Sequence, residues 1–310
     1  MRENKPCSFL RKTTTCFRRI FRNRDAVAGN DLKIYPDDVF VVCYPRSGNT
    51  WIRFLLGTII FGVDITFDTM ESYVPDIYVN THAQLERLAR PRYLKSHEPY
   101  DRRYPKAIYL VRDPRDVAIS YYYWMLKFNR ISGTLQEFLD IFFDRSRLPY
   151  GRWDDHVRGW ERAATNAKDR VLFMRYEDLL ANTPIMVHTI TAFLGLPADS
   201  KRINDAIREN DFTSMKQKET AASSENELFK QTRKDIRFVR AGKQGQWEET
   251  LSPEQQERFF HEFGKVMETY GYGRSRPGKT ADTSRSEGTR ALAACGQTEC
   301  EACGPEGRRK

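Results

Sequence analysis

The fold of this chain is decided by the stretch Val39-Phe40-Val41-Val42-Cys43-Tyr44-Pro45-Arg46-Ser47-Gly48-Asn49-Thr50-Trp51. The run from Val39 to Tyr44 carries no charge and is rich in β-branched and aromatic residues, which is typical of a strand buried in a parallel sheet. A polar turn with Ser, Gly and Asn follows, and an apolar segment of helix length then extends from Thr50 to Phe61. The stretch therefore predicts a strand, a loop and a helix, in which loop N–H groups and the helix dipole form a cradle for an anion.

The same order of elements recurs further along the chain. Ala107–Val111 is a second apolar run, and it leads into Asp113-Pro114, a good N-cap followed by a good first helical residue. Val171–Met174 is a third run, and Thr183-Pro184 starts another helix by the same logic. Repeated strand, turn and helix predict one α/β domain with a central parallel sheet flanked by helices. In such folds ligands bind at the carboxyl ends of the strands.

Composition divides the 310 residues into three regions. Residues 1–30 are basic and without regular periodicity, so we expect a flexible tail, whose Phe17–Arg22 segment could make weak contact with an anionic membrane surface. Residues 31–272 form the folded domain. Residues 273–310 contain few large apolar side chains, which predicts a disordered tail. No run reaches the ~20 apolar residues of a transmembrane helix, and no apolar region follows the basic N-terminus as in a signal peptide, so we expect a cytoplasmic protein.

Charge and cysteine content narrow the classes of partner. The formal net charge of +9 favours polyanions such as phosphorylated nucleotides, nucleic acid or sulfated surfaces, without choosing among them. Five of the six cysteines lie in the tails, so they form no disulfide framework for the domain. The C-terminal Cys295, Cys300 and Cys303 are one ligand short of a zinc site and have no histidine nearby. We therefore expect no bound metal.

A lysine and a histidine lie close together at the end of a predicted strand. In the extended segment Leu94-Lys95-Ser96-His97, Lys95 and His97 are two residues apart and project to the same side. A cation beside a histidine suits the neutralisation of a leaving anion and the removal of a proton from an attacking group. The alternative is a structural histidine.

Two further segments carry cations suited to a second phosphate. Arg112 closes a strand and Ser120 lies two turns into the helix that follows, although a structural pair of arginine and aspartate is the alternative. The glycine-punctuated basic segment 238–247 could close over a phosphate. The Walker sequence Gly-x-x-x-x-Gly-Lys-Ser/Thr is absent, which disfavours a kinase-like phosphotransferase. A non-catalytic basic protein that binds anions through its tails is the other alternative.

In this order, over about residues 35–272, these segments resemble the cytosolic PAPS-dependent sulfotransferase family, as do Arg175–Asp178 and Phe212–Lys216. The resemblance implies a fold whose strand–loop–helix binds phosphosulfate as a P-loop binds phosphate. It implies transfer of a sulfuryl group from 3′-phosphoadenosine 5′-phosphosulfate (PAPS) to a hydroxyl or amine acceptor, with release of PAP and without a metal. The expected acceptor is a small molecule, a carbohydrate or a lipid alcohol, and not nucleic acid.

The resemblance also implies a role for individual residues. His97 is the general base, and Lys95 and Arg46 stabilise the leaving oxygen. The residues that hold the donor are Arg46, Ser47, Gly48, Asn49, Thr50 and Trp51 at the phosphosulfate, Arg112, Ser120, Arg240, Ala241 and Gly242 at the 3′-phosphate, and Tyr176 and Phe212 at the adenine. His156 matches a segment near the acceptor.

The chain departs from the family pattern at three places. Arg46 stands where soluble members usually have lysine, and Ala241 stands where a second cation is common. The usual dimer motif is not present, because the segment Glu248–Glu257 lacks its Lys, Thr and Val. The acceptor itself cannot be read from the loops 66–91 and 128–152. Their aromatic residues could line a pocket or form core, and nearby arginines leave an anionic or carbohydrate acceptor open; these are Phe128, Phe138, Phe142, Phe143, Tyr150, Trp153, Arg145, Arg147 and Arg152.

Overall fold

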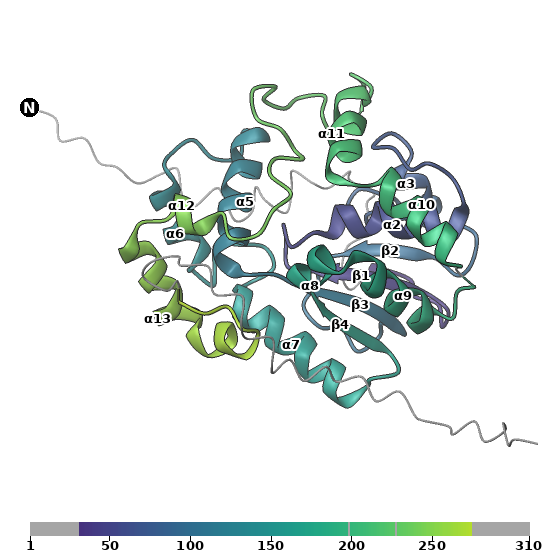
Figure 1. The fold of residues 1–310 in the computed structure, drawn as a ribbon, viewed down its shortest axis with the longest axis horizontal. Coiled ribbons are helices and arrows are strands. Elements are labelled where there is room, and N and C mark those ends of the chain that lie inside the picture. The colour runs from purple at the N-terminus through teal and green to yellow at the C-terminus, as the bar shows by residue number, and fades with distance from the viewer. Residues whose placement is uncertain (1–30, 198, 227, 275–310) are drawn as a thin grey trace, which may run out of the picture. The chain divides into compact units, whose positions relative to one another are not determined.

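The computed structural model describes residues 31–197, 199–226 and 228–274 (Figure 1). The tail predicted for residues 1–30, all but the first two residues of the tail predicted for 273–310, and the three C-terminal cysteines lie outside these residues. Within the described ranges, no helix combines the length and the apolar character that a membrane crossing requires.

A parallel sheet forms the centre of the domain. Its four strands are β1 (Val39–Cys43), β2 (Tyr93–Ser96), β3 (Lys106–Val111) and β4 (Val171–Arg175), in the order β2-β1-β3-β4. Strand β1 pairs with β2 on one side and with β3 on the other, so that Val41 lies opposite both Lys95 and Ile108. The predicted strands and their parallel arrangement are confirmed. Because all strands point the same way, their carboxyl ends meet at one edge of the sheet.

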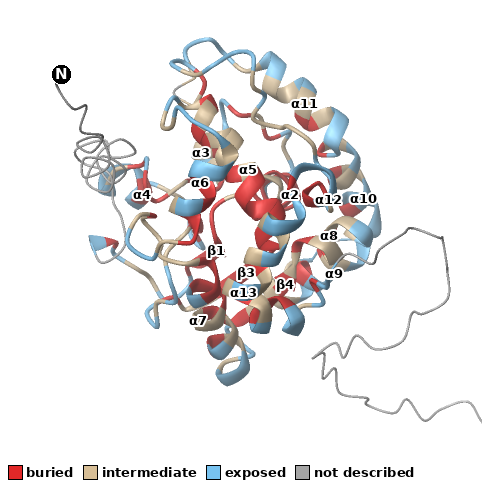
Figure 2. Cartoon of the chain, turned by 90° about the vertical axis from the view of Figure 1, so that its left-hand side faces the viewer, coloured by how far each residue is buried: buried red, intermediate tan, exposed pale blue. Residues whose placement is uncertain are grey.

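Helices cover both faces of this sheet (Figure 1). Phe40 and Val42 face one cluster, and Val41 and Cys43 face the other, which explains why the β1 sequence is apolar at every position. The first cluster is completed by α5 (Pro114–Lys127), α6 (Leu135–Phe142), α7 (Trp153–Asn166) and α13 (Pro253–Thr269). The second is completed by α2 (Asn49–Phe61), α8 (Tyr176–Ala181), α9 (Thr183–Leu194) and α10 (Ser200–Glu209). Figure 2 shows the buried residues concentrated along the strands and the helix faces packed against them.

Four further helices of the described residues are short or lie at the periphery of the domain. They are α3 (Met70–Tyr73), α4 (His82–Glu86), α11 (Phe212–Ala221) and α12 (Trp247–Thr250). Among these, α11 is followed by a loop that runs back to α5, where the Arg233 N–H donates to the Lys127 carbonyl at 2.8 Å (Figure 1).

The two predicted helix starts have different outcomes. Asp113 caps α5 as expected, accepting a hydrogen bond from the Arg115 backbone N–H at 2.9 Å. Helix α9 begins at Thr183, but its N-cap is Asn182, so Thr183 does not cap the helix as we predicted. The reason is that α8 ends immediately before it, and the Thr183 hydroxyl donates to the Leu179 carbonyl of that helix at 2.8 Å.

A buried ion pair holds the amino ends of β1 and β2 together. The Arg92 Nε and Nη2 atoms donate to the two carboxylate oxygens of Asp38 at 2.8 and 2.5 Å, and both side chains are almost fully buried. The Val39 N–H donates to the Arg92 carbonyl at 2.8 Å, next to this pair. The pair therefore helps to fix how β1 aligns with β2.

Replacing Arg92 by Met should destabilise the fold by about 3–5 kcal/mol, because the Asp38 carboxylate would stay buried without its cation. Urea unfolding of the purified variant measures this change. The matched control is Arg90→Met, which removes an exposed partner of Asp37 two residues away and should have little effect. Equal losses in both variants would show that the buried pair has no special weight.

Candidate active site

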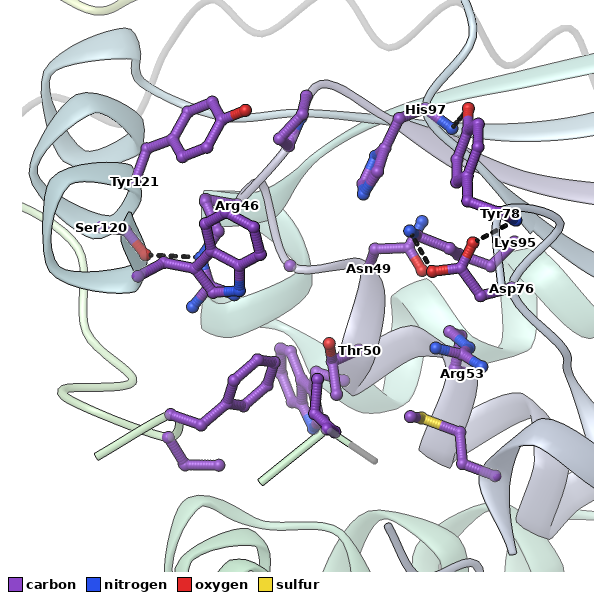
Figure 3. Close-up of a pocket in the computed structure, with 18 of the residues that line it drawn as sticks. Arg46, Asn49, Thr50, Arg53, Asp76, Tyr78, Lys95, His97, Ser120 and Tyr121 are labelled. Atoms are coloured by element: carbon purple, nitrogen blue, oxygen red, sulfur yellow. Dashed lines mark hydrogen bonds and ion pairs between the residues drawn. The ribbon is translucent and has the colours of Figure 1, made fainter. Parts of the chain in front are cut away.

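One large cavity opens at the carboxyl edge of the sheet. Its volume is about 1840 Å³, and it is lined by the loop after β1, by residues at the ends of β2 and β3, and by α5, α11 and the segment 238–246. Of the residues that the sequence assigned to donor binding and catalysis, all but Ser47 lie on its wall. Figure 3 shows Arg46, His97, Lys95 and Ser120 together around it.

The loop after β1 has the backbone shape of an anion cradle. Arg46 and Gly48 adopt left-handed conformations with φ of 73° and 108°, which turn the chain sharply into α2. Gly48 is the N-cap of α2 and offers no side chain to its first N–H groups. The Trp51 N–H already donates to the Gly48 carbonyl at 3.1 Å. The earlier N–H groups of the helix, those of Asn49 and Thr50, have no partner within it, so they remain available to a negatively charged ligand.

Two polar side chains of this loop face the protein. The Asn49 amide donates to the Val41 carbonyl at 3.1 Å and ties the start of α2 to β1. The Ser47 side chain is fully buried away from the cavity wall, and its hydroxyl has no hydrogen-bond partner within the described residues. Thr50 and Trp51 lie on the wall, and the Trp51 indole donates to the Asn210 carbonyl at 2.9 Å.

Three arginines gather beside the loop. The Arg112 guanidinium donates to the Arg46 carbonyl at 3.3 Å, and the Arg46 Nε donates to the Ser120 hydroxyl at 3.2 Å. Burial, and then the charges of Arg112 and Arg240, lower the pKa of Arg46 to about 10. Within the described ranges, Arg46 and Arg240 have no carboxylate within 4.0 Å, and the nearest to Arg112 is Asp116 at 3.7 Å. Positive charges held this close together favour a bound anion.

Flat apolar surfaces adjoin the arginines. The Arg112 guanidinium lies 4.3 Å from the centre of the Tyr176 ring. Phe212 is partly exposed and lies so close to Gly242 that a Cβ there would be 2.2 Å from its ring, so this position requires glycine. Ala241 contributes wall but no charge.

His97 is held in the form that a base requires. Its Nδ1 lies 2.7 Å from the Cys43 carbonyl oxygen, which only accepts, so Nδ1 carries the proton and Nε2 has the free lone pair. The His97 backbone N–H donates to the Tyr78 hydroxyl at 2.8 Å. Burial, followed by the charge of Lys95, lowers the pKa of His97 well below 6.5. The imidazole is therefore neutral at pH 7.

His156 lies behind His97 and is absent from the cavity wall. Its Nε2 donates to the His97 carbonyl at 3.0 Å, and its Nδ1 then accepts from the Tyr109 hydroxyl at 2.9 Å. The resemblance suggested a place near the acceptor, but the ring is buried because these two hydrogen bonds draw it into the core. His156 therefore supports the backbone of His97.

The aromatic residues left open by the sequence divide between cavity and core. Phe128 and Tyr150 lie on the wall, whereas the others belong to the hydrophobic core; these are Phe138, Phe142, Phe143 and Trp153. The three nearby arginines pair with carboxylates outside the cavity: Arg145 with Asp155, Arg147 with Asp144, and Arg152 with Asp154 and Glu262. They do not support the anionic acceptor that the sequence left open.

Residues 36–271 match the sequence profile of the family described as "Sulfotransferase domain". The chain belongs to the sulfotransferase family. Relatives include sulfotransferase 1E1 of Bos taurus, 30% identical over 252 residues that cover 75% of this chain and 84% of that protein. The amine sulfotransferase of Oryctolagus cuniculus is 30% identical over 258 residues, covering 78% and 84%.

Solved structures share the fold of this sulfotransferase. Retinol dehydratase in complex with androsterone and PAP has a TM-score of 0.66 at 20% identity, covering 76% of this chain and 82% of that one. Mouse sulfotransferase SULT7A1 with PAP has a TM-score of 0.62 at 24% identity, covering 78% and 87%. The predicted family, fold and reaction class, PAPS-dependent sulfuryl transfer, are confirmed. A kinase-like phosphotransferase and a non-catalytic basic protein are thereby set aside.

Sequence reasoning missed several charged residues that line this sulfotransferase's cavity, and Asp76 is the one that contacts a predicted site residue by an ion pair. The Asp76 carboxylate lies on the cavity wall and accepts a hydrogen bond from the Lys95 ammonium at 2.6 Å (Figure 3). The only signal in the sequence is a single acid within the apolar run Val74–Val79. Among the described residues, no cluster of three or more His, Cys, Asp or Glu side chains is placed to hold a metal ion.

Replacing Gly48 by Ala should weaken PAP binding at least tenfold, or by ~1.4 kcal/mol. The new Cβ would lie 2.6 Å from the Tyr176 ring on a residue with φ of 108°, so the cradle must distort. Calorimetric titration with PAP measures the effect. Gly264→Ala is the control, since nothing lies within 4 Å of a Cβ added there inside α13. It should leave PAP affinity unchanged, and similar losses in both variants would contradict the cradle.

Proposed function

We propose that the cavity transfers a sulfuryl group from PAPS to the hydroxyl or amine of a small acceptor, with His97 as general base. The observation that carries this assignment is the cluster of Arg46, Arg112 and Arg240, which share one cavity with a neutral histidine. The cluster suits a doubly phosphorylated nucleotide, and the histidine suits removal of a proton.

The donor residues divide into three groups. The loop from Arg46 to Trp51 would hold the 5′-phosphosulfate, mainly by its backbone N–H groups. Arg112, Ser120, Arg240 and Gly242 would surround the 3′-phosphate. Trp51, Tyr176 and Phe212 offer flat surfaces to the adenine. The Ser47 side chain is buried beneath the loop, so it would support the loop without contacting the donor.

The reaction needs no group beyond these residues and the two substrates. The acceptor oxygen attacks sulfur and an O–S bond forms, while the bond between sulfur and the bridging oxygen breaks. The bridging oxygen keeps the electron pair as PAP leaves, and Nε2 of His97 takes the acceptor proton. Lys95 and Arg46 would face the charge that grows on the bridging oxygen, and such donors commonly contribute about 3–4 kcal/mol each.

The acceptor class, the location and the oligomeric state follow from the sequence predictions. We propose a small molecule, a carbohydrate or a lipid alcohol as acceptor, and the cytoplasmic location stays a prediction. The dimer surface of related proteins is not expected, since Ser252 and Pro253 serve as N-cap and first residue of α13. This local role of the two residues is consistent with the proposal that the usual dimer surface is absent.

PAP should bind at least tenfold more tightly than adenosine 5′-phosphate, a difference of ~1.4 kcal/mol, because only PAP reaches the second set of cations. Calorimetry with both nucleotides measures the ratio, and Arg240→Met should reduce it. Equal affinities would contradict the assignment of Arg112, Ser120 and Arg240 to the 3′-phosphate.

Turnover should not change on addition of EDTA, and a strict Mg²⁺ requirement would contradict the mechanism.

His97→Ala should lower kcat by roughly 10²–10⁴ while PAP affinity stays nearly constant, because other residues hold the nucleotide. In the wild type, protonation of the imidazole removes the base. Since burial places the pKa of His97 well below 6.5, kcat should stay level through pH 6.5 and fall only at lower pH.

The control for His97→Ala is a second readout on the same sample. Thermal melting and PAP affinity distinguish a lost base from a damaged strand end. Lys95→Ala should behave differently: it should lower kcat, and it should weaken the binding of PAPS more than the binding of PAP. Near-normal turnover in a folded His97→Ala protein would disprove the catalytic assignment.

A further inference from the structure

The backbone brings Asp76 directly beside Lys95. The segment around Asp76 runs parallel to β2, with the Lys95 N–H donating to the Pro75 carbonyl at 2.8 Å and the Ile77 N–H donating to the Lys95 carbonyl at 3.2 Å. The two side chains meet on the cavity wall, where the ammonium lies 2.6 Å from Asp76 Oδ2 (Figure 3). Both are largely buried, with exposed fractions of 11% and 16%.

Asp76 is held firmly in this place. Its backbone N–H donates to Glu71 Oε2 at 2.7 Å, and the other Glu71 oxygen accepts from Arg53 at 2.7 Å. The Asn80 amide bridges Glu71 and the Asp76 carbonyl at 2.8 and 2.9 Å. The carboxylate itself accepts from Lys95 and, through Oδ1, from the Tyr78 backbone N–H at 2.9 Å. Asp76 is therefore fixed by its backbone, whereas Lys95 has a long flexible stem.

The proposed mechanism requires Lys95 at the transferring sulfuryl group. An ammonium that stays 2.6 Å from a carboxylate has most of its charge neutralised, so it stabilises a leaving oxygen poorly. If Lys95 turns to the donor, Asp76 keeps only the Tyr78 N–H, and a largely buried carboxylate is left without a cation. A second cation at the same point would remove this cost.

The position that Lys95 occupies suits such a cation. The Lys95 Nζ lies 5.0 Å from the centre of the Tyr78 ring, so a carboxylate and an aromatic face both act there. The ring centres of Tyr78 and Tyr150 are 5.5 Å apart, and the ring centre of Tyr150 is 5.4 Å from that of His97. These contacts place the position of the Lys95 ammonium near the base. Glu98 adds a further carboxylate to the same wall. The surroundings of Asp76 thus offer carboxylates and aromatic rings to a cation, and the nearby Arg53 is already paired with Glu71 at 2.7 Å.

We propose that the acceptor is a hydroxyl compound that carries an amine, whose ammonium binds Asp76 in place of Lys95. The hydroxyl then lies at His97, and Lys95 is released towards the sulfuryl group. This inference rests on the proposed sulfuryl transfer and names the substrate class of the same site. Asp76 is a specificity residue in this scheme, acting on the acceptor and, through Lys95, on the donor.

Two matched pairs of acceptors test the proposal: tyramine with 4-ethylphenol, and 3-hydroxybenzylamine with 3-methylphenol. Each pair differs by the ammonium group. Binding to the enzyme saturated with PAP is measured by calorimetry, and kcat/KM is measured with PAPS. In the wild type, at least one amine should exceed its neutral partner by tenfold or more in both measurements. Asp76→Asn should reduce that ratio to near one.

The matched control is Asp101→Asn, which alters another acid on the cavity wall. The Asp101 carboxylate is bonded to Arg103, whereas Lys95 is bonded to Asp76, so the ratio should not change. Asp76→Glu keeps the charge and should retain part of the preference, which guards against an Asp76→Asn protein that fails to fold.

The outcomes separate this inference from the proposed function. A wild type that sulfates the neutral phenols without preferring either amine overturns the inference and leaves sulfuryl transfer standing. Equal losses for amine and neutral acceptors in Asp76→Asn also overturn it, because Asp76 would then only position Lys95. If PAP does not bind, the proposed function fails. If PAP binds without turnover, the calorimetric ratio alone decides, and a ratio near one overturns the inference.

Discussion

The parallel pairing of β1 with both β2 and β3 is the constraint on which the site depends. The carbonyl of Cys43, the last residue of β1, orients the ring of His97, the first residue after β2. This contact exists only while Val41 stays opposite Lys95, since a shift by one residue would turn the side chains to the other face. On the other side, the pairing of Cys43 with Leu110 brings Arg112 to the Arg46 loop. Catalytic geometry here is a property of sheet register.

The use of arginine at position 46 has a geometric consequence. A lysine has one nitrogen, whereas the guanidinium can donate from Nε to Ser120 and still present its two Nη groups elsewhere. The residue holds this arrangement in a left-handed conformation, φ 73°, beside two other arginines. The free cluster is electrostatically unfavourable, and a bound anion offsets that cost. Part of the fold's stability is therefore linked to occupancy of the donor site.

What could be predicted from the sequence followed from local rules. An uncharged run makes a buried strand, a glycine permits the turn, and Asp-Pro starts a helix, so the strand ends and the loop after β1 follow from local pattern. The place of Tyr176 and Phe212 on the cavity wall was expected only from the family resemblance. The burial of His156 depends on a partner distant in the sequence, Tyr109. Local pattern also did not indicate that the Ser47 side chain is buried. Asp76 lies beside Lys95 through an isolated parallel β-bridge, which no periodicity in the sequence predicts.

The neutral state of His97 links the two halves of the cavity. Burial is the main reason that its pKa is low, and the charge of Lys95 is the second. In the proposed mechanism the acceptor oxygen lies between His97 and the sulfur atom, so a Lys95 that turns to the sulfuryl group keeps its positive charge on the same side of the cavity as the ring. An ammonium at Asp76 would add a second positive charge there, and both charges would oppose protonation of His97. The proposed exchange of cations is therefore compatible with a neutral base.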